Sequence, residues 1–274
     1  MRKFIRSNLK YAVLVLSALL TITPILVIWI SSLKSSSEIY NNPFALPKIL
    51  HWENLVQAWT VGRFYKYMVN TFIVTFPTVL FVVSLSCIAG YAFAKLKFAG
   101  SKIFFYTFLL GLMLPFQSIM IPLYYLVRDL KLLGTYWAMI LPATALGLPF
   151  GIFLMQAFFR SIPSELMDAA SVDGCNEFMV FLKIMLPLAA PAVSTLIVFQ
   201  FMWTWNALLM PMLLLNRESL RPIMLGLMFF SGRYTINYGL VAAGVTIASF
   251  PLMIVFFIFQ RRFIRGLTAG AIKG

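Results

Sequence analysis

Residues 68–94 read MVNTFIVTFPTVLFVVSLSCIAGYAFA, a run of 27 residues without a single charged side chain. As an α-helix this run would be about 40 Å long, which is enough to cross the roughly 30 Å hydrocarbon layer of a bilayer. A soluble protein cannot bury several segments of this kind, because its helices need a polar face. The run therefore predicts a transmembrane helix.

Five further uncharged runs of at least 22 residues flank the first, and all 30 charged residues of the chain fall outside the six runs. Each run is long enough to span a bilayer as a helix. We therefore expect an all-α membrane protein with six transmembrane helices, at residues 11–33, 68–94, 104–127, 137–159, 188–215 and 239–260.

The composition agrees, since 61% of residues are hydrophobic and 11% are charged, where a soluble domain carries about 25% charged residues. The net charge of +14 reflects a shortage of acids, and we expect no nucleic-acid partner.

Basic residues collect on the cytoplasmic side of membranes. Four of them lie beside the first span and four beside the last, so we expect both termini to be cytoplasmic.

The first 33 residues have a basic start and an apolar core, as a signal peptide does, but the core is too long and no A-x-A cleavage site follows. We expect this segment to be retained.

Cys87 lies in a predicted span and Cys175 in a predicted cytoplasmic loop, so a disulfide is not expected. The single histidine, His51, has no nearby partner in the sequence, and no metal site is predicted.

The chain divides into three parts by composition. Residues 1–67 hold the first span and a polar, turn-rich extracytoplasmic loop; residues 68–260 hold a five-helix core; residues 261–274 form a cytoplasmic tail. Prolines interrupt most spans, which indicates a packed bundle around a pathway, although ordinary kinking explains any single proline equally well.

The most informative loop is 160–187, which reads RSIPSELMDAASVDGCNEFMVFLKIMLP. Ser161 can cap a first short helix, Gly174 can end it, and Asn176 can cap a second. Ala169 and Ala170 would let another protein approach closely. The alternative is a solvated amphipathic connector.

This loop follows the spacing of one known motif. It has Asp168-Ala169-Ala170, then Gly174 four residues after Ala170, and then Ile184-Met185-Leu186-Pro187. The pattern resembles the "EAA" loop of ABC-importer permeases, with Asp168 in place of the usual Glu. Three other parts of the chain are similar to the smaller permease of maltose-type carbohydrate importers. They are the C-terminal stretch 260–274, the pair Trp205-Asn206 and the segment Pro43-Phe-Ala-Leu-Pro47.

This resemblance implies a type I ABC-importer permease fold in a bacterial or archaeal plasma membrane. It implies a second homologous permease, two ATPase subunits and an extracytoplasmic solute-binding protein as partners, with membrane lipid around the spans. The chain has no G-x-x-x-x-G-K-[ST] phosphate loop. We therefore expect no enzymatic activity and no cofactor on this chain, with ATP and Mg²⁺ bound by the ATPase subunits.

The resemblance also assigns roles to residues of this chain. The loop residues expected to couple to the ATPase are Glu165, Leu166, Asp168, Ala169, Ala170, Gly174, Ile184, Leu186 and Pro187. The tail residues expected to contact the ATPase are Leu267, Thr268, Ala269, Gly270, Ala271, Ile272, Lys273 and Gly274. A tail of this composition should be disordered without a partner, and a simple membrane anchor would explain its arginines alone.

Two further sets are expected outside the cytoplasm. The loop 216–238 should contact the binding protein through Phe229, Phe230, Arg233 and Tyr234. The substrate pathway is assigned to Trp203, Trp205 and Asn206, because sugars are held by aromatic faces and amide groups. Packing against lipid or other helices remains an equal alternative for Trp205 and the favoured one for Trp203. A helix interface is an equal alternative for Asn206.

Other classes of membrane protein fit less well. An ion-coupled secondary transporter is expected to keep acids within its spans, and an intramembrane enzyme needs a nucleophile with a base or a metal cluster. The predicted spans hold no His, Asp or Glu. The sequence predicts an ATP-driven importer of a sugar or oligosaccharide; a secondary transporter or an importer of another solute is the alternative.

Overall fold

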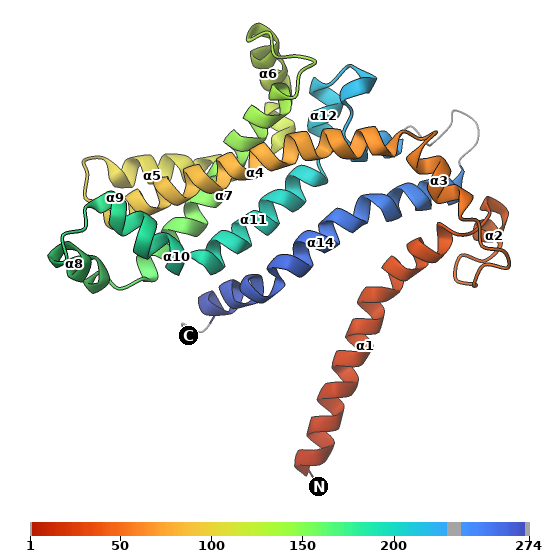
Figure 1. Ribbon diagram of the computed structural model, residues 1–274, viewed down its shortest axis with the longest axis horizontal. Coiled ribbons are helices and arrows are strands. Elements are labelled where there is room, and N and C mark those ends of the chain that lie inside the picture. Colours follow the sequence, from red (N-terminus) through yellow and green to blue (C-terminus); the bar gives the residue numbers. More distant parts are fainter. Residues whose placement is uncertain (1, 229–236, 272–274) are drawn as a thin grey trace. The chain divides into compact units, whose positions relative to one another are not determined.

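The computed structural model describes the backbone of residues 2–228 and 237–271, and the side chains of 10–228 and 237–261. All regular secondary structure in these residues is helical (Figure 1), which confirms the all-α prediction. The chain divides into two compact units. The smaller consists of Met1–Met68 with Leu225–Phe250, and the larger of Val69–Met224 with Pro251–Gly274.

The smaller unit combines the N-terminal quarter of the chain with a segment from its C-terminal part. Its elements are α1 (Arg2–Ser31), α2 (Ser36–Asn41), α3 (Glu53–Trp59), most of α13 (Ile223–Met228) and the first part of α14 (Tyr238–Ala271). Trp29 of α1 stacks on Phe250 of α14, with ring centroids 5.7 Å apart. Gly226 of α13 lies so close to Tyr67 that a Cβ there would clash with its ring.

A buried cation organises the loop that follows α1. Lys34 is only 1% exposed, and its Nζ donates hydrogen bonds to the carbonyl oxygens of Asn42 and Pro43, each at 3.1 Å. Asn54 of α3 donates to the carbonyl oxygens of Ser32 and Lys34. Unpaired backbone groups and a buried charge are both costly, so these bonds hold the loop in one conformation. No pattern in the sequence indicated this role for Lys34.

The helix α2 begins at a capping box. Ser35 accepts a hydrogen bond from the backbone N–H of Glu38, and the Glu38 carboxylate accepts one from the backbone N–H of Ser35. Hydrogen bonds from the backbone N–H groups of Lys48 and Ser35 lower the pKa of Glu38. The carboxylate therefore stays ionised and ties α2 to the chain that follows it.

The larger unit contains the predicted core. Its elements are most of α4 (Phe64–Lys95), α5 (Ser101–Leu110), η1 (Gly111–Met113), α6 (Phe116–Asp129), α7 (Trp137–Ser161), α8 (Glu165–Val172), α9 (Glu177–Val180), the π-helical turn η2 (Phe181–Met185), α10 (Leu186–Leu188), α11 (Ala190–Trp205), α12 (Leu209–Leu214), η3 (Glu218–Leu220) and the end of α14. The helices α4, α7 and α11 run side by side (Figure 1).

Glycines on α7 allow this close packing. A Cβ on Gly151 would clash with Ser86 of α4, and one on Gly147 would lie 2.6 Å from Gln200 Oε1 of α11 and 2.9 Å from Val82 of α4. The two glycines are four residues apart and so share one face of the helix. Small residues at this spacing are a common way for membrane helices to approach each other closely.

Four helices of the described part can cross a membrane unbroken, by length and composition: α1, α4, α7 and α14. The count reaches six only if two bent pairs each form one span. The first pair, Ser101–Met113 with Phe116–Asp129, bends by 104°. Leu114 and Pro115 are extended there, because proline lacks an N–H and disfavours a helical residue before it. The span predicted at 104–127 therefore consists of two helices that meet at Leu114 and Pro115, in keeping with the prolines that interrupt the predicted spans.

The second bent pair also differs from the prediction. Glu177–Leu188 meets Ala190–Trp205 at 73°, so the apolar run expected at 188–215 is divided. The helix α11 has 16 residues, which is about 24 Å and shorter than the hydrocarbon layer. It ends at Asn206, and α12 then forms a separate short helix. Hydropathy could not detect these breaks, since apolar residues continue across them.

Candidate functional site

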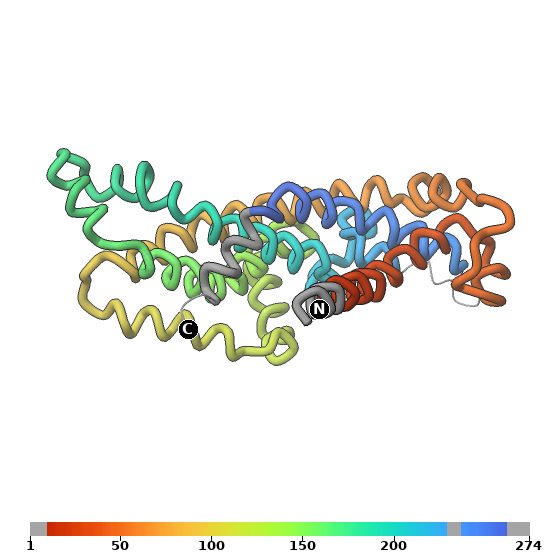
Figure 2. Tube along the Cα trace, turned by 90° about the horizontal axis from the view of Figure 1, so that it is seen from below, coloured from red at the N-terminus to blue at the C-terminus, as the bar shows by residue number. Residues whose placement is uncertain are grey.

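The segment between α7 and α11 lies at one end of the larger unit, at the far left of Figures 1 and 2. The helix α7 continues to Ser161, whose hydroxyl donates to the carbonyl oxygen of Phe158. Ser164 precedes α8 and makes no side-chain capping bond. The prediction that Ser161 caps the first short helix is therefore wrong, because no helix breaker occurs before Pro163.

The first short helix, α8, ends as the sequence predicts. Gly174 has a φ of +82°, the left-handed conformation that favours glycine. The backbone N–H of Cys175 donates to the carbonyl oxygen of Ala170 at 2.9 Å, and that of Gly174 to Ser171 at 3.1 Å. These bonds close the helix and reverse the chain direction.

The second short helix, α9, also begins as predicted. The Asn176 side chain accepts a hydrogen bond from the backbone N–H of Met179 at 2.8 Å, which caps the helix. Glu177 lies in the first turn, and its Oε2 accepts a hydrogen bond from the hydroxyl of Tyr91 on α4 at 3.1 Å. This bond links the loop directly to a span.

An aromatic cluster continues that link. The Tyr91 ring lies 5.8 Å from the ring of Phe159 on α7 and 5.1 Å from that of Phe181 on η2. Met185 is fully buried in the same core. The loop is therefore part of a core that it shares with α4, α7 and α11, and a solvated connector does not describe it.

Lys95 forms a further contact between α4 and this segment, and this contact was not predicted from the sequence. Its Nζ, at the end of α4, donates to the carbonyl oxygen of Ile162 at 2.5 Å and to the Ser164 hydroxyl at 3.3 Å. A cation in the last turn of α4 suits the helix dipole as well. The only sequence signal was its place directly after a long uncharged run.

The predicted coupling residues divide into an exposed and a packed set. Glu165, Leu166, Asp168, Ala169, Gly174 and Pro187 are exposed. Ile184 and Leu186 are half-buried and pack against the core. Ala170 is 5% exposed and belongs to that core, so its expected place on the outer surface is wrong. Exposure on a short helix depends on which face meets the core, and adjacent alanines lie on different faces.

The exposed surface of the segment is acidic. Four of the chain's eight acids, Glu165, Asp168, Asp173 and Glu177, lie within 13 residues, and no lysine or arginine occurs between 161 and 182. All four are exposed. A surface of one charge attracts a complementary partner and disfavours a like-charged one. The acidic face of α8 therefore suits a basic protein surface.

The three residues assigned to the pathway have different environments. Trp205 is completely buried and packs between Phe72 and Phe201, with ring centroids 4.9 and 5.2 Å away. Trp203 is 44% exposed. Asn206 is exposed, and its Nδ2 donates to the carbonyl oxygen of Met202 at 2.8 Å. Trp205 thus acts in packing, whereas Trp203 and Asn206 remain accessible.

Some predicted residues lie outside the described part. These are the binding-protein residues Phe229, Phe230, Arg233 and Tyr234, and the last three tail residues, Ile272, Lys273 and Gly274. The backbone of α14 is helical as far as Ala271, so the expectation of a disordered tail is wrong for Leu267–Ala271. Among the residues searched, no three His, Cys, Asp or Glu side chains come together as metal ligands.

Comparison with known proteins identifies the family. Residues 82–269 match the family described as "Binding-protein-dependent transport system inner membrane component". The chain belongs to this family. It is therefore a multi-pass membrane protein and a transport permease subunit, as the sequence predicted.

Curated relatives span nearly the whole chain. The chain is 38% identical to the probable ABC transporter permease protein YurM of Bacillus subtilis, over 92% of this chain and 83% of YurM. It is 32% identical to the diacetylchitobiose uptake permease NgcG of Streptomyces coelicolor, over 97% and 88%. It is 34% identical to the arabinooligosaccharide permease AraQ of Halalkalibacterium halodurans, over 94% and 93%.

A solved structure confirms the fold. The chain resembles one chain of a bacterial ABC transporter that imports alginate, with a TM-score of 0.81 over 96% of this chain and 98% of that chain. The sequences are 23% identical. The ABC-importer permease fold inferred from the loop motif is therefore correct.

Proposed function

We propose that this chain is one of two permease subunits of an ATP-driven importer for a sugar or oligosaccharide. The observation that carries the proposal is the acidic, exposed α8 held on the same core as α4, α7 and α11. The solute class follows from the diacetylchitobiose and arabinooligosaccharide relatives. An extracytoplasmic binding protein delivers the solute, and both termini lie in the cytoplasm.

The segment α8–α9 acts as the lever between ATP hydrolysis and the pathway. Two partner ATPase subunits bind ATP and Mg²⁺, and one of them docks on the face that carries Glu165, Leu166 and Asp168. Movement of that face passes to α4 through the Tyr91–Glu177 bond and through Lys95. The spans then change between inward- and outward-facing arrangements as rigid bodies.

The helix α8 is suited to this role because it has few independent motions. Its carboxyl end is fixed by the left-handed Gly174, and Ala170 is anchored in the core. A docked subunit therefore moves the whole segment together with the core beneath it. The remaining contacts to the ATPase come from the tail residues Leu267–Gly274.

The solute passes along the face that carries Trp203 and Asn206, with a second homologous permease forming the opposite wall. Trp203 offers an exposed aromatic face beside Phe150, with ring centroids 4.9 Å apart. Aromatic faces and amides are the groups that pockets use for sugars. Phe229, Phe230, Arg233 and Tyr234 contact the binding protein.

The test is to purify the chain with its co-expressed partners and measure ATP hydrolysis with the binding protein over a panel of sugars. We expect stimulation by at least one oligosaccharide. Stimulation by amino acids or metal ions and by no sugar would refute the carbohydrate assignment. Failure of any ATPase to co-purify would refute the subunit assignment.

Charge reversal on α8 tests the lever. Asp168→Lys should abolish most stimulated hydrolysis and transport, because it places a cation on the face proposed to meet a basic surface. Asp129→Lys is the matched control, since Asp129 is an exposed acid at the end of α6. Equal activity in the two variants would show that the acidic face of α8 does not dock the ATPase.

A further inference from the structure

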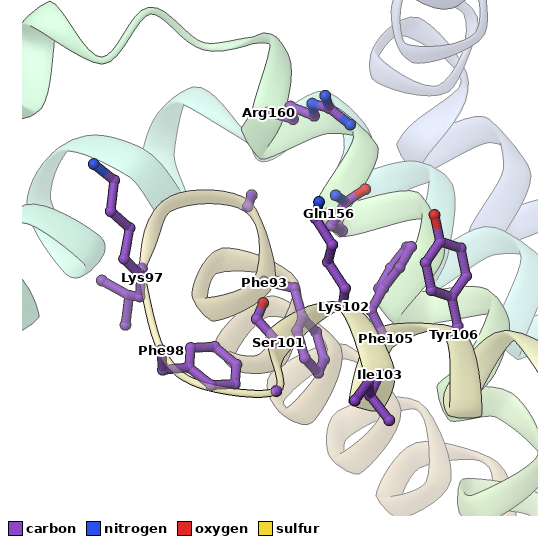
Figure 3. A pocket seen from close by; sticks show the side chains of 13 residues that line it. Phe93, Lys97, Phe98, Ser101, Lys102, Ile103, Phe105, Tyr106, Gln156 and Arg160 are labelled. Carbon is purple, nitrogen blue, oxygen red and sulfur yellow. The ribbon is translucent and has the colours of Figure 1, made fainter.

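A cavity of about 740 Å³ opens between the start of α5 and the ends of α4 and α7. Figure 3 shows its wall: Phe93 and Lys97 come from α4 and the turn after it, Lys102 from α5, and Gln156 and Arg160 from α7. None of these residues belongs to the coupling set, and the proposed transport cycle does not use the cavity.

Three basic side chains from different elements surround the cavity. Lys97, Lys102 and Arg160 all line it and are exposed. Lys102 extends toward Gln156, and Arg160 lies one turn further along α7 on the same face (Figure 3). No acid lines the cavity, and within the described part of the chain no carboxylate pairs with any of the three cations.

The wall below the cations is apolar and aromatic. Phe93 lies 5.8 Å from Phe98 and 5.6 Å from Phe105, measured between ring centroids. Ile103 and Tyr106 of α5 also line the cavity and are 72% and 63% exposed; Leu110, further along α5 and outside the cavity, is 60% exposed. Their spacing of three and four residues places them along one side of the helix. An apolar track therefore leads away from the basic rim.

The cavity lies at the membrane boundary. The uncharged run of α4 ends at Lys95, and that of α5 begins after Lys102. Lys95 also donates to Ile162 and Ser164, so this end of the spans is the one that carries α8. In the proposed topology it faces the cytoplasmic leaflet.

We propose that this cavity binds an anionic phospholipid. The phosphate group lies among Lys97, Lys102 and Arg160, the Gln156 amide bonds a phosphate or glycerol oxygen, and an acyl chain follows Ile103, Tyr106 and Leu110. Basic pockets between spans bind anionic headgroups in this way. A soluble anion would satisfy the cations but would leave the apolar track uncovered, and a basic protein surface would be repelled.

The position of the site gives the lipid a role. Gln156 and Arg160 belong to the last turns of α7, directly before α8, and the turn with Lys97 follows Lys95. A lipid that bridges α5 and α7 would hold the base of the coupling segment together. The membrane composition would then affect how firmly the lever is held.

The test is to incorporate the purified transporter into nanodiscs with a photoreactive phosphatidylglycerol and to identify labelled peptides by mass spectrometry. We expect labelling within 93–106 and 153–160. The triple variant Lys97→Gln, Lys102→Gln, Arg160→Gln should bind the lipid about a hundredfold more weakly, since each of the three basic residues near an anionic surface contributes roughly fivefold.

A second triple variant, Lys48→Gln, Lys66→Gln, Lys131→Gln, removes the same charge from exposed positions outside the cavity. It should keep normal labelling of 93–106 and 153–160. Equal labelling in both triple variants would overturn the proposal. Labelling that is abolished by excess inorganic phosphate or ATP, but not by unlabelled phosphatidylglycerol, would show a soluble-anion site instead. Elution of each variant as a single peak in size-exclusion chromatography would show that it still folds.

Discussion

The helices α1 and α7 each contain a long apolar stretch without charged residues, yet the surroundings of these stretches differ. The most apolar 18-residue stretch of α1 contains no buried residue, whereas 56% of the corresponding stretch of α7 is buried. The difference follows from small residues: α7 carries Gly147 and Gly151 where α4 and α11 approach, and α1 has no glycine. Hydropathy selects a span, but side-chain size decides whether its own chain can enclose it.

The largest expected effect is at the closest helix contact. Gly151→Leu should destabilise the protein by about 3 kcal/mol or more, because the new side chain must displace Ser86 and the backbone of α4. Ala18→Leu is the matched change in α1, where Ala18 is exposed, and it should change stability by less than about 0.5 kcal/mol. Unfolding in mixed detergent–SDS micelles would measure both.

A compensating change separates packing from other causes. Gly151→Ala places a Cβ against Ser86, and Ser86→Gly removes the atoms that it would meet. The double variant should therefore be more stable than Gly151→Ala alone. If the two changes simply add, the contact between α4 and α7 is not the source of the destabilisation.

A smaller effect is expected where α8 ends. Gly174→Ala should cost about 1 kcal/mol, because the left-handed backbone is strained for a residue with a Cβ. No neighbouring atom lies within 4 Å of that Cβ, so the strain comes from the backbone alone. Gly174→Asn should be milder, since asparagine tolerates this conformation. Unfolding and stimulated ATPase activity should both rank glycine, asparagine, alanine; equal values would remove the role of Gly174 in shaping the segment.

An effect of similar size is expected at the hydrogen bond between the segment and α4. Tyr91→Phe keeps the ring packing but removes the donor to Glu177, which should cost about 0.5–1.5 kcal/mol. Tyr11→Phe in α1 is the control, because Tyr11 is 66% exposed and forms no hydrogen bond among the described side chains. A loss of coupled transport with Tyr91→Phe, beyond its loss of stability, would support the lever. Identical behaviour of the two variants would argue against it.

The ends of short helices could be predicted from the sequence wherever a single residue determines the backbone conformation. Gly174 and Asn176 fulfil their predicted roles because a left-handed turn and an N-cap depend on one side chain each. Each uncharged run likewise overlaps one of the four candidate spans or one of the two bent helix pairs of the described residues. Bends were harder: Pro115 gives a 104° bend while Pro77 lies within a continuous helix. Neighbouring helices decide which proline breaks a span.

Tertiary contacts accounted for the other differences. Ala170 was expected at a surface, and for Trp205 the pathway and helix packing were equal alternatives; both residues are buried in the larger unit. Lys95 and Lys34 looked like ordinary charged residues, yet each organises a loop through backbone carbonyl groups. No pattern in the sequence records which face of a short helix meets a distant span. Contacts of this kind can be predicted only when the packing is known.

The central claim is that the exposed face of α8 docks an ATPase subunit, and photo-crosslinking tests it most directly. A benzophenone amino acid would replace Leu166 on α8 or, as control, Leu20 on α1; the two side chains are 42% and 67% exposed. After irradiation of membranes that contain the whole transporter, position 166 should give a covalent product with the ATPase and position 20 should give none. An ATPase product from position 20 with none from position 166 would contradict the account.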